Sequence, residues 1–174
     1  MKLLIVRHAI AMDREDFKSA SKRQSDDMRP LTDEGVRKMR KNAKGLARIA
    51  HKPDLVISSP LVRAIQTSEI LQIEWSSSTA KCDALKPDAA PIELARWLAG
   101  YKTAIQTNHT VAIVGHEPHL SRLIAWCLES SHTEAFELKK GGACLIEFEE
   151  AGISHGGGRL IWTLTPKILR GLQG

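Results

Sequence analysis

Three short apolar runs, each followed by a cationic or imidazole side chain, limit the folds that this chain can adopt. The runs lie within Leu3–Val6, Asp54–Ser59 and Val111–Val114. They are too short for helices and rich in β-branched residues, so they predict buried strands. The long segments between them predict helical crossovers. We therefore expect the three strands to be parallel.

The residues after these strands are of types that bind phosphate. Arg7 and His8 follow the first strand, Arg63 comes soon after the second, and His116 follows the third. Because parallel strands place their carboxyl ends along one sheet edge, we expect the four side chains to meet in one pocket. Taken singly, each of these residues also has an ordinary structural explanation. Arg7 and His8 could be surface or satisfied core residues, and Arg63 could form a surface ion pair with Glu69 or an aspartate.

Capping residues and apolar periodicity predict helices between the strands. Thr32 is a good N-cap for a helix whose apolar stripe ends near Ala50, and the basic side chains of that helix are expected to face solvent. Ser59 is expected to cap a second helix, 61–71, which carries Arg63 in its first turn, where an anion is favoured. Further helices are expected to start at two prolines, Pro91 and Pro118.

The rest of the chain gives weaker signals. Residues 13–29 form a polar segment that fits a surface loop, a frayed helix or a loop over the site entrance. Residues 76–78 predict a loop, and 84–88 a short strand or extended stretch. Residues 143–148 and 159–165, separated by three glycines, predict an antiparallel hairpin. Pro166 is expected to end it, leaving a short tail.

These elements predict an α/β fold: a three-layer α/β/α sandwich whose mostly parallel central sheet ends in an antiparallel hairpin. No internal repeat or composition break divides the chain, so 1–174 is expected to be a single domain. The four-residue apolar run after Lys2 is too short for a signal peptide, and no run approaches the ~20 apolar residues of a membrane span. A cytoplasmic location without a membrane partner is expected.

Charge and cysteine content narrow the possible ligands. The formal net charge of +5 favours an anionic ligand or partner. Nucleic acid is not expected, because the Lys and Arg residues are spread out and lack flanking aromatic residues. Cys82, Cys127 and Cys144 fit neither a disulfide framework nor a zinc motif, so free thiols are expected.

Two arginines and two histidines without a neighbouring acidic triplet favour phosphoryl transfer without a metal or other cofactor. A neutral imidazole would attack phosphorus, and the arginines would bind the oxygens on which charge develops. The segment from His116 to His119 could suggest a metal pair, but Pro118 and the lack of further ligands argue against it. The triple glycine lacks the following Lys-Ser/Thr of a P-loop.

Several motifs carry a family resemblance. Leu4–His8, Ser59–Thr67 and Val114–His116 resemble the core motifs of the histidine phosphatase (phosphoglycerate-mutase-like) superfamily. Residues 29–35, 115–121 and 162–166, and the short length, are similar to its SixA-type phosphohistidine phosphatase branch.

The resemblance implies an α/β/α fold and a role for each pocket residue. His8 would be the phosphoacceptor, and Arg7, Arg63 and His116 would complete the catalytic and phosphate-binding set. A phosphohistidine-containing protein, such as a phosphorelay domain, would be the substrate. The chain departs from the superfamily at Ala9, where glycine is usual. Because alanine is small, the pocket is expected to survive.

The general acid is a second departure. Larger relatives supply a carboxylate from an inserted segment, whereas this chain offers only Glu117, Asp88 and Glu93 as candidates, each with a structural alternative. A leaving imidazole, with a reference pKa near ~6.5, departs with little help. A pocket without a strong acid therefore favours phosphohistidine over a phosphate ester. The alternatives are a broad small-molecule phosphomonoesterase or mutase, and a catalytically weak phosphoprotein-binding module.

Overall fold

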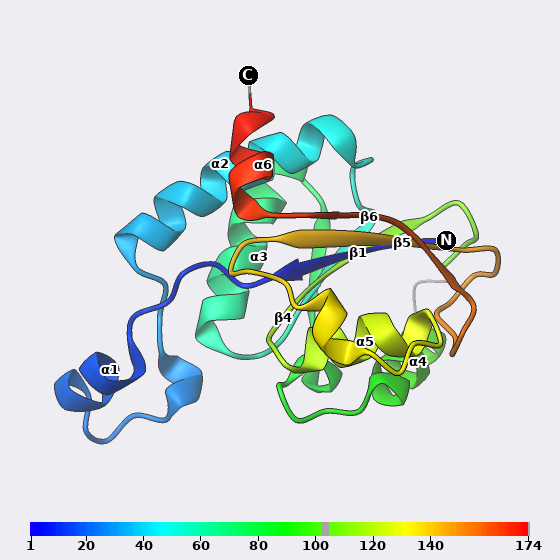
Figure 1. Cartoon of the computed structure of the whole chain (residues 1–174). Helices are drawn as coiled ribbons and strands as arrows, with labels where there is room; N and C mark the ends of the chain where they lie inside the picture. Colours follow the sequence, from blue (N-terminus) through cyan, green and yellow to red (C-terminus); the bar gives the residue numbers. More distant parts are fainter. Residues whose placement is uncertain (102–104, 174) are drawn as a thin grey trace.

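The computed structural model describes residues 1–101 and 105–173 (Figure 1). Strand β1 (Lys2–Arg7) lies inside a six-stranded sheet whose strand order is β3-β2-β4-β1-β5-β6. It pairs in parallel with β4 and antiparallel with β5. The other strands are β2 (Leu55–Ser58), β3 (Ser78–Lys81), β4 (Thr110–Gly115), β5 (Ala143–Phe148) and β6 (Gly158–Leu164).

The sheet has the predicted mixed character. Strands β2, β3, β4 and β1 are parallel, and the β5–β6 hairpin adds two antiparallel strands at one edge. The register places Arg7 opposite Gly115. The residues that follow, His8 and His116, are therefore neighbours where both strands end.

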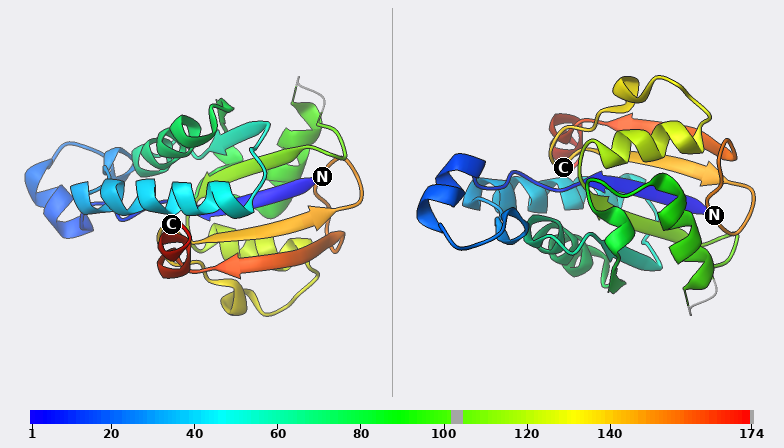
Figure 2. Two further views of the ribbon diagram at one scale, coloured as in Figure 1. Left: turned by 90° about the horizontal axis from the view of Figure 1, so that it is seen from above. Right: turned by 90° about the horizontal axis from the view of Figure 1, so that it is seen from below.

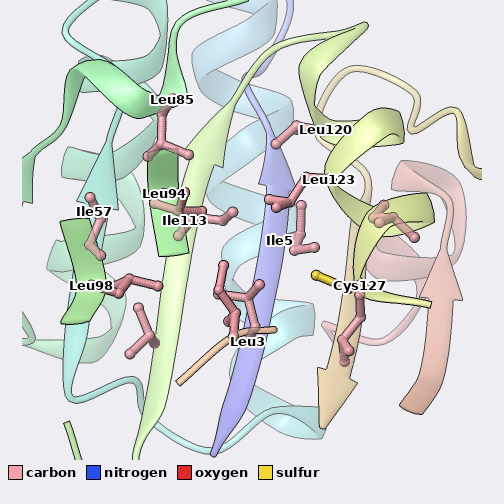
Figure 3. Packing of buried hydrophobic residues seen from close by; sticks show 14 of the residues in the cluster. Leu3, Ile5, Ile57, Leu85, Leu94, Leu98, Ile113, Leu120, Leu123 and Cys127 are labelled. Carbon is pink, nitrogen blue, oxygen red and sulfur yellow. The ribbon is translucent and has the colours of Figure 1, made fainter. Parts of the chain in front are cut away.

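Two layers of helices cover the sheet (Figure 2). One layer holds α2 (Asp33–Ile49), α3 (Val62–Trp75) and α6 (Pro166–Gly171), and the other holds α4 (Pro91–Gly100) and α5 (His119–Cys127). Side chains of β1 alternate between the layers, as strand geometry requires. Leu3 and Ile5 pack against α4 and α5 (Figure 3), and Leu4 and Val6 pack on the opposite face. The predicted three-layer α/β fold is confirmed.

Helix α2 follows its sequence signals closely. The Thr32 hydroxyl accepts a hydrogen bond from the Gly35 amide at 3.0 Å, as an N-cap does. Met39, Ala43 and Leu46 are buried. The basic side chains point mainly to solvent, as expected; those that are exposed are Arg37, Arg40, Lys41, Lys44 and Arg48.

Helix α3 begins later than predicted, and Ser59 is not its N-cap. The N-cap is Leu61, which has no side-chain cap hydrogen bond. The Ser59 Oγ atom accepts a long hydrogen bond of 3.4 Å from the Leu61 amide and lies closer, at 2.9 Å, to the Nε2 atom of His116. The prediction was wrong because a contact with a residue far along the chain, which local sequence does not show, engages the hydroxyl.

Two minor predictions were also wrong, and a third held only in part. The loop expected at 76–78 is confirmed at Ser76 and Ser77, but Ser78 begins the edge strand β3, whose mostly exposed polar side chains give no apolar signal. Within 84–88, where a short strand or extended stretch was expected, the 3-10 helix η2 (Asp83–Leu85) is followed by a turn. The short tail after Pro166 is helix α6, in which Thr165 is the N-cap and Leu169 is fully buried.

The polar segment 13–29 extends beyond the carboxyl edge of the sheet (Figures 1 and 2). It forms the short helix α1 (Arg14–Ala20) and the 3-10 helix η1 (Asp26–Met28). Most of its side chains are exposed, but Phe17 and Arg29 are buried. In the described part of the chain, no helix has the length and apolar character that a bilayer crossing needs.

The contact between α2 and α6 gives a testable prediction. A Cβ atom at Gly45 would lie 1.9 Å from the Leu169 carbonyl oxygen. We expect Gly45→Ala to lower the free energy of unfolding by about 1–3 kcal/mol, because the displaced backbone outweighs the higher helix propensity of alanine. Urea unfolding measures this difference.

Gly100→Ala is the matched control, because no described atom lies within 4 Å of a Cβ atom built at Gly100. It should leave stability unchanged or raise it by up to about 1 kcal/mol. Equal effects of the two substitutions would contradict the proposed packing of α6.

Candidate active site

The four predicted site residues lie where β1 and β4 end and α3 begins. The His8 amide donates to the Gly115 carbonyl at 3.1 Å, and the ring centroids of His8 and His116 are 4.9 Å apart. His8, Arg63 and His116 are buried, with 6%, 4% and 2% of their surfaces exposed. Polar groups this deeply buried are stable only when hydrogen bonds or opposite charges compensate them.

His8 has a defined tautomer. Its Nδ1 atom lies 2.7 Å from the Ala9 carbonyl oxygen, which can only accept a hydrogen bond. Nδ1 therefore carries the proton, and Nε2 presents a lone pair. Burial lowers the pKa of His8 to about 3, and the charges of Arg63, Arg7 and Lys140 act in the same direction, although the bond to Ala9 opposes them. At neutral pH the ring is therefore uncharged.

The backbone around His8 is fixed by bonds from two other parts of the fold. The Ala9 amide donates to the Thr67 hydroxyl on α3 at 3.1 Å, and that hydroxyl donates to the Arg63 carbonyl at 2.7 Å. The Gly141 amide donates to the carbonyls of Arg7 and His8, both at 3.1 Å. Gly141 has φ +78°, a conformation that favours glycine. Ala9, at the position where glycine was noted as usual, is buried in this backbone arrangement.

Arg63 pairs with the 13–29 segment and not with Glu69. Its Nη1 donates to the Asp26 carbonyl at 3.0 Å and lies 3.3 Å from the Asp26 carboxylate. Arg29 and Arg14 also contact that carboxylate. Burial alone would raise the pKa of Asp26, but its hydrogen bond to Arg29 and the arginine charges hold the pKa below its usual value. Asp26 is therefore ionised, and it anchors this segment at the pocket.

Arg7 is held from the opposite side by the segment before β5. Its Nη1 donates to the Leu138 carbonyl and lies 3.5 Å from the exposed Glu137 carboxylate. The Leu138 amide in turn donates to Glu117 Oε1 at 2.9 Å. Glu117 also accepts hydrogen bonds from Ser121, so both of its oxygens are engaged in structure.

Three buried nitrogen atoms of the pocket have no hydrogen-bond partner among the residues described. They are the Nε atoms of Arg7 and Arg63 and the Nδ1 atom of His116. Orphaned buried donors are costly, and a phosphate or similar anion would satisfy them. The set can therefore bind a tetrahedral anion beside the free Nε2 lone pair of His8.

The general-acid candidates do not contribute a free carboxylic acid to this pocket. Glu93 accepts a hydrogen bond from the Ala90 amide at 3.3 Å within α4, and Asp88 is exposed. The carboxylates that do reach the pocket arginines are Asp26 and Glu137. The sequence suggested an unspecified aspartate as one possible partner of Arg63 but singled out neither residue. Asp26 had one usable signal, its position three residues before Arg29. Within the described ranges, no three His, Cys, Asp or Glu side chains are placed to hold a metal ion.

Comparison with known proteins gives the family to which this α/β fold belongs. The family model described as histidine phosphatase superfamily (branch 1) matches residues 3–86. An uncharacterized protein of Picosynechococcus sp. is 30% identical over 174 residues, which are 97% of this chain and 99% of the relative. The chain belongs to the histidine phosphatase superfamily, branch 1.

Solved structures share the fold at low identity. The protein histidine phosphatase SixA complexed with tungstate is 23% identical with a TM-score of 0.78, covering 97% of this chain and 99% of that one. A SixA structure from Agrobacterium tumefaciens is 21% identical with a TM-score of 0.73, covering 95% and 97%. A phosphoserine phosphatase from Entamoeba histolytica is 17% identical with a TM-score of 0.64, covering 95% and 98%.

Buried histidines predict a pH-dependent stability. Burial lowers the pKa of His8 to about 3, of His116 to about 2 and of His119 to about 4. In the unfolded chain the histidine pKa values are near ~6.5. Below pH ~6.5 the unfolded chain therefore binds more protons than the folded protein. The free energy of unfolding should therefore fall as the pH drops from 6.5 to 4, by about 2 kcal/mol per histidine at pH 5.

His119→Leu tests this prediction, because His119 is fully buried and neither ring nitrogen has a partner in the described structure. The variant should be at least as stable as the wild type at pH 7 and lose less stability at pH 5. Urea unfolding at both pH values gives the comparison. Parallel losses in the two proteins would contradict the assigned burial of a neutral His119.

Proposed function

We propose that this protein hydrolyses phosphohistidine on a partner protein through a covalent phosphoryl intermediate on His8. One observation carries the proposal: the Nδ1–H of His8 is engaged by Ala9, which leaves a neutral Nε2 lone pair in a site where the Nε atoms of Arg7 and Arg63 and the Nδ1 atom of His116 have no partner among the described residues. His8 would be the nucleophile. Arg7, Arg63 and His116 would bind the phosphoryl oxygens, on which charge develops during transfer.

The two chemical steps make symmetrical use of His8. In the first, Nε2 forms a bond to phosphorus while the P–N bond of the substrate breaks. In the second, water attacks phosphorus, the Nε2–P bond breaks, and the water proton leaves with phosphate or solvent. Nδ1 keeps its proton throughout and donates it in a hydrogen bond to the Ala9 carbonyl. His8 therefore departs from phosphorus as a neutral imidazole. The same hydrogen bond therefore supports attack and release.

The proposed substrate class follows from how the carboxylates are engaged. Once its other ring nitrogen carries a proton, phosphohistidine releases a neutral imidazole, so no proton is needed at the breaking bond. An alkyl phosphate ester releases an alkoxide, which needs a general acid. Glu117 is fully hydrogen-bonded, and Asp26 is held ionised by arginines. This supports phosphohistidine, although a phosphoserine phosphatase has a similar fold.

A protein substrate fits the surroundings of the pocket. The segment from Glu137 to Lys140 exposes both charge signs beside Arg7, and Arg14 and Lys18 are exposed on the 13–29 segment. These side chains are available to contact a protein surface around the phosphorylated residue. A histidine-containing phosphorelay domain is the kind of partner that we propose.

The substrate class is tested with a phosphohistidine protein prepared chemically and with phosphoserine as the ester. We expect kcat/KM for the phosphohistidine protein to exceed that for the ester by at least about 100-fold, because general acid catalysis contributes 10²–10⁴-fold and is missing for the ester. Release of inorganic phosphate measures both rates. Equal rates would identify a broad phosphomonoesterase and contradict the proposed substrate.

The nucleophile is tested by His8→Ala. Turnover should fall at least about 1,000-fold, whereas inorganic phosphate should still bind, because the arginines and His116 remain. His132→Ala, which changes an exposed histidine, is the matched control and should be unaffected. Undiminished turnover in the His8 variant would rule out the mechanism, and binding without turnover in the wild type would favour a phosphoprotein-binding module.

A further inference from the structure

Ser59 lies between strand β2 and helix α3 and is fully buried. Its backbone amide donates to the Val114 carbonyl at 3.0 Å, and its carbonyl accepts the Ser58 hydroxyl at 2.7 Å. Two contacts of its side chain are found in the described structure: the Leu61 amide at 3.4 Å and His116 Nε2 at 2.9 Å.

The direction of the bond between Ser59 and His116 follows from counting donors and acceptors. The Leu61 amide can only donate to the Ser59 oxygen. If His116 Nε2 also donated, the hydroxyl proton would have no acceptor among the described residues, which is costly at a buried site. If the hydroxyl donates to Nε2, every polar group of Ser59 is satisfied.

We infer that Ser59 is a positioning residue: its hydroxyl donates to His116 Nε2 and holds His116 in the Nδ1–H tautomer, so that Nδ1–H is the donor offered to the transferring phosphoryl group. Nε2 is engaged by Ser59, so Nδ1, which is buried and has no partner in the described structure, is the nitrogen left for that group. In the opposite tautomer, Nδ1 would present a lone pair to a phosphoryl oxygen and repel it.

This assignment rests on the proposed function only where it concerns turnover. A neutral histidine carries one proton. When one ring nitrogen accepts a hydrogen bond, the proton lies on the other nitrogen, which can then donate. His116 is neutral at physiological pH because burial lowers its pKa to about 2, so its value as a donor depends entirely on the tautomer. Ser59 would therefore act on the phosphoryl group through His116 without touching it.

The tautomer is measured directly by ¹⁵N NMR of the histidine rings in the free wild-type protein at pH 7. We expect the His116 Nδ1 signal at a protonated-nitrogen shift and the Nε2 signal at an unprotonated one. Addition of inorganic phosphate should then shift Nδ1 more than Nε2. An Nε2–H tautomer in the wild type would overturn the inference, whether or not the protein is a phosphatase.

Two variants test the role of the hydroxyl. Ser59→Ala should convert His116 to a mixture or to the Nε2–H tautomer, weaken inorganic phosphate binding, and lower kcat for the phosphohistidine protein by about 10- to 100-fold. Ser58→Ala is the matched control, because it removes a neighbouring buried hydroxyl that contacts the Ser59 carbonyl. It should leave the tautomer unchanged.

Ser59→Thr retains the hydroxyl and should restore the Nδ1–H tautomer, which keeps the test decisive if Ser59→Ala fails to fold. A wild-type tautomer retained in folded Ser59→Ala would overturn the inference. An Nδ1–H tautomer in a wild type without phosphatase activity would instead contradict the proposed function and leave the assignment of Ser59 intact.

Discussion

The hydrogen bond from His8 Nδ1 to the Ala9 carbonyl is the interaction on which the site depends. It fixes which nitrogen of His8, the proposed nucleophile, is free, and it persists only if the chain leaves β1 along a single path. That path is set by the parallel register of β1 with β4, by Thr67 on α3 and by Gly141 before β5. Three elements distant in sequence therefore determine the state of one imidazole.

Burial makes this imidazole useful and also costly. Removing His8 and His116 from water keeps both rings neutral, as the proposed nucleophile and the proposed hydrogen-bond donor must be. It also lowers the stability of the folded protein as the pH falls, because the unfolded chain then binds more protons. Arg63 would otherwise be a buried charge, and Arg7 a half-buried charge, without a partner. Asp26 compensates Arg63 from outside the sheet, and Leu138 compensates Arg7. The 13–29 segment thus contributes an anchored carboxylate at the edge of the pocket.

Sequence reasoning predicted the parallel strands and the positions of His8, Arg63 and His116, because short apolar runs and strand ends are local signals. It missed β3 because an exposed edge strand has no apolar pattern, and it treated α6 as a tail although Thr165 and Pro166 are ordinary helix-start residues. The partners of Ser59, Arg63 and Arg7 were not predictable. Each contact joins residues far apart in the chain, and a single sequence carries no record of such pairs.

The proposed mechanism transfers the phosphoryl group to the Nε2 atom of His8. The most direct measurement is the NMR spectrum of the ¹⁵N-labelled protein after denaturing quench of a reaction with phosphohistidine protein, in which ³¹P–¹⁵N coupling identifies the phosphorylated nitrogen. We expect an acid-labile phosphoryl group on Nε2 of His8. Phosphorus on Nδ1, or on another residue such as His116, would contradict it.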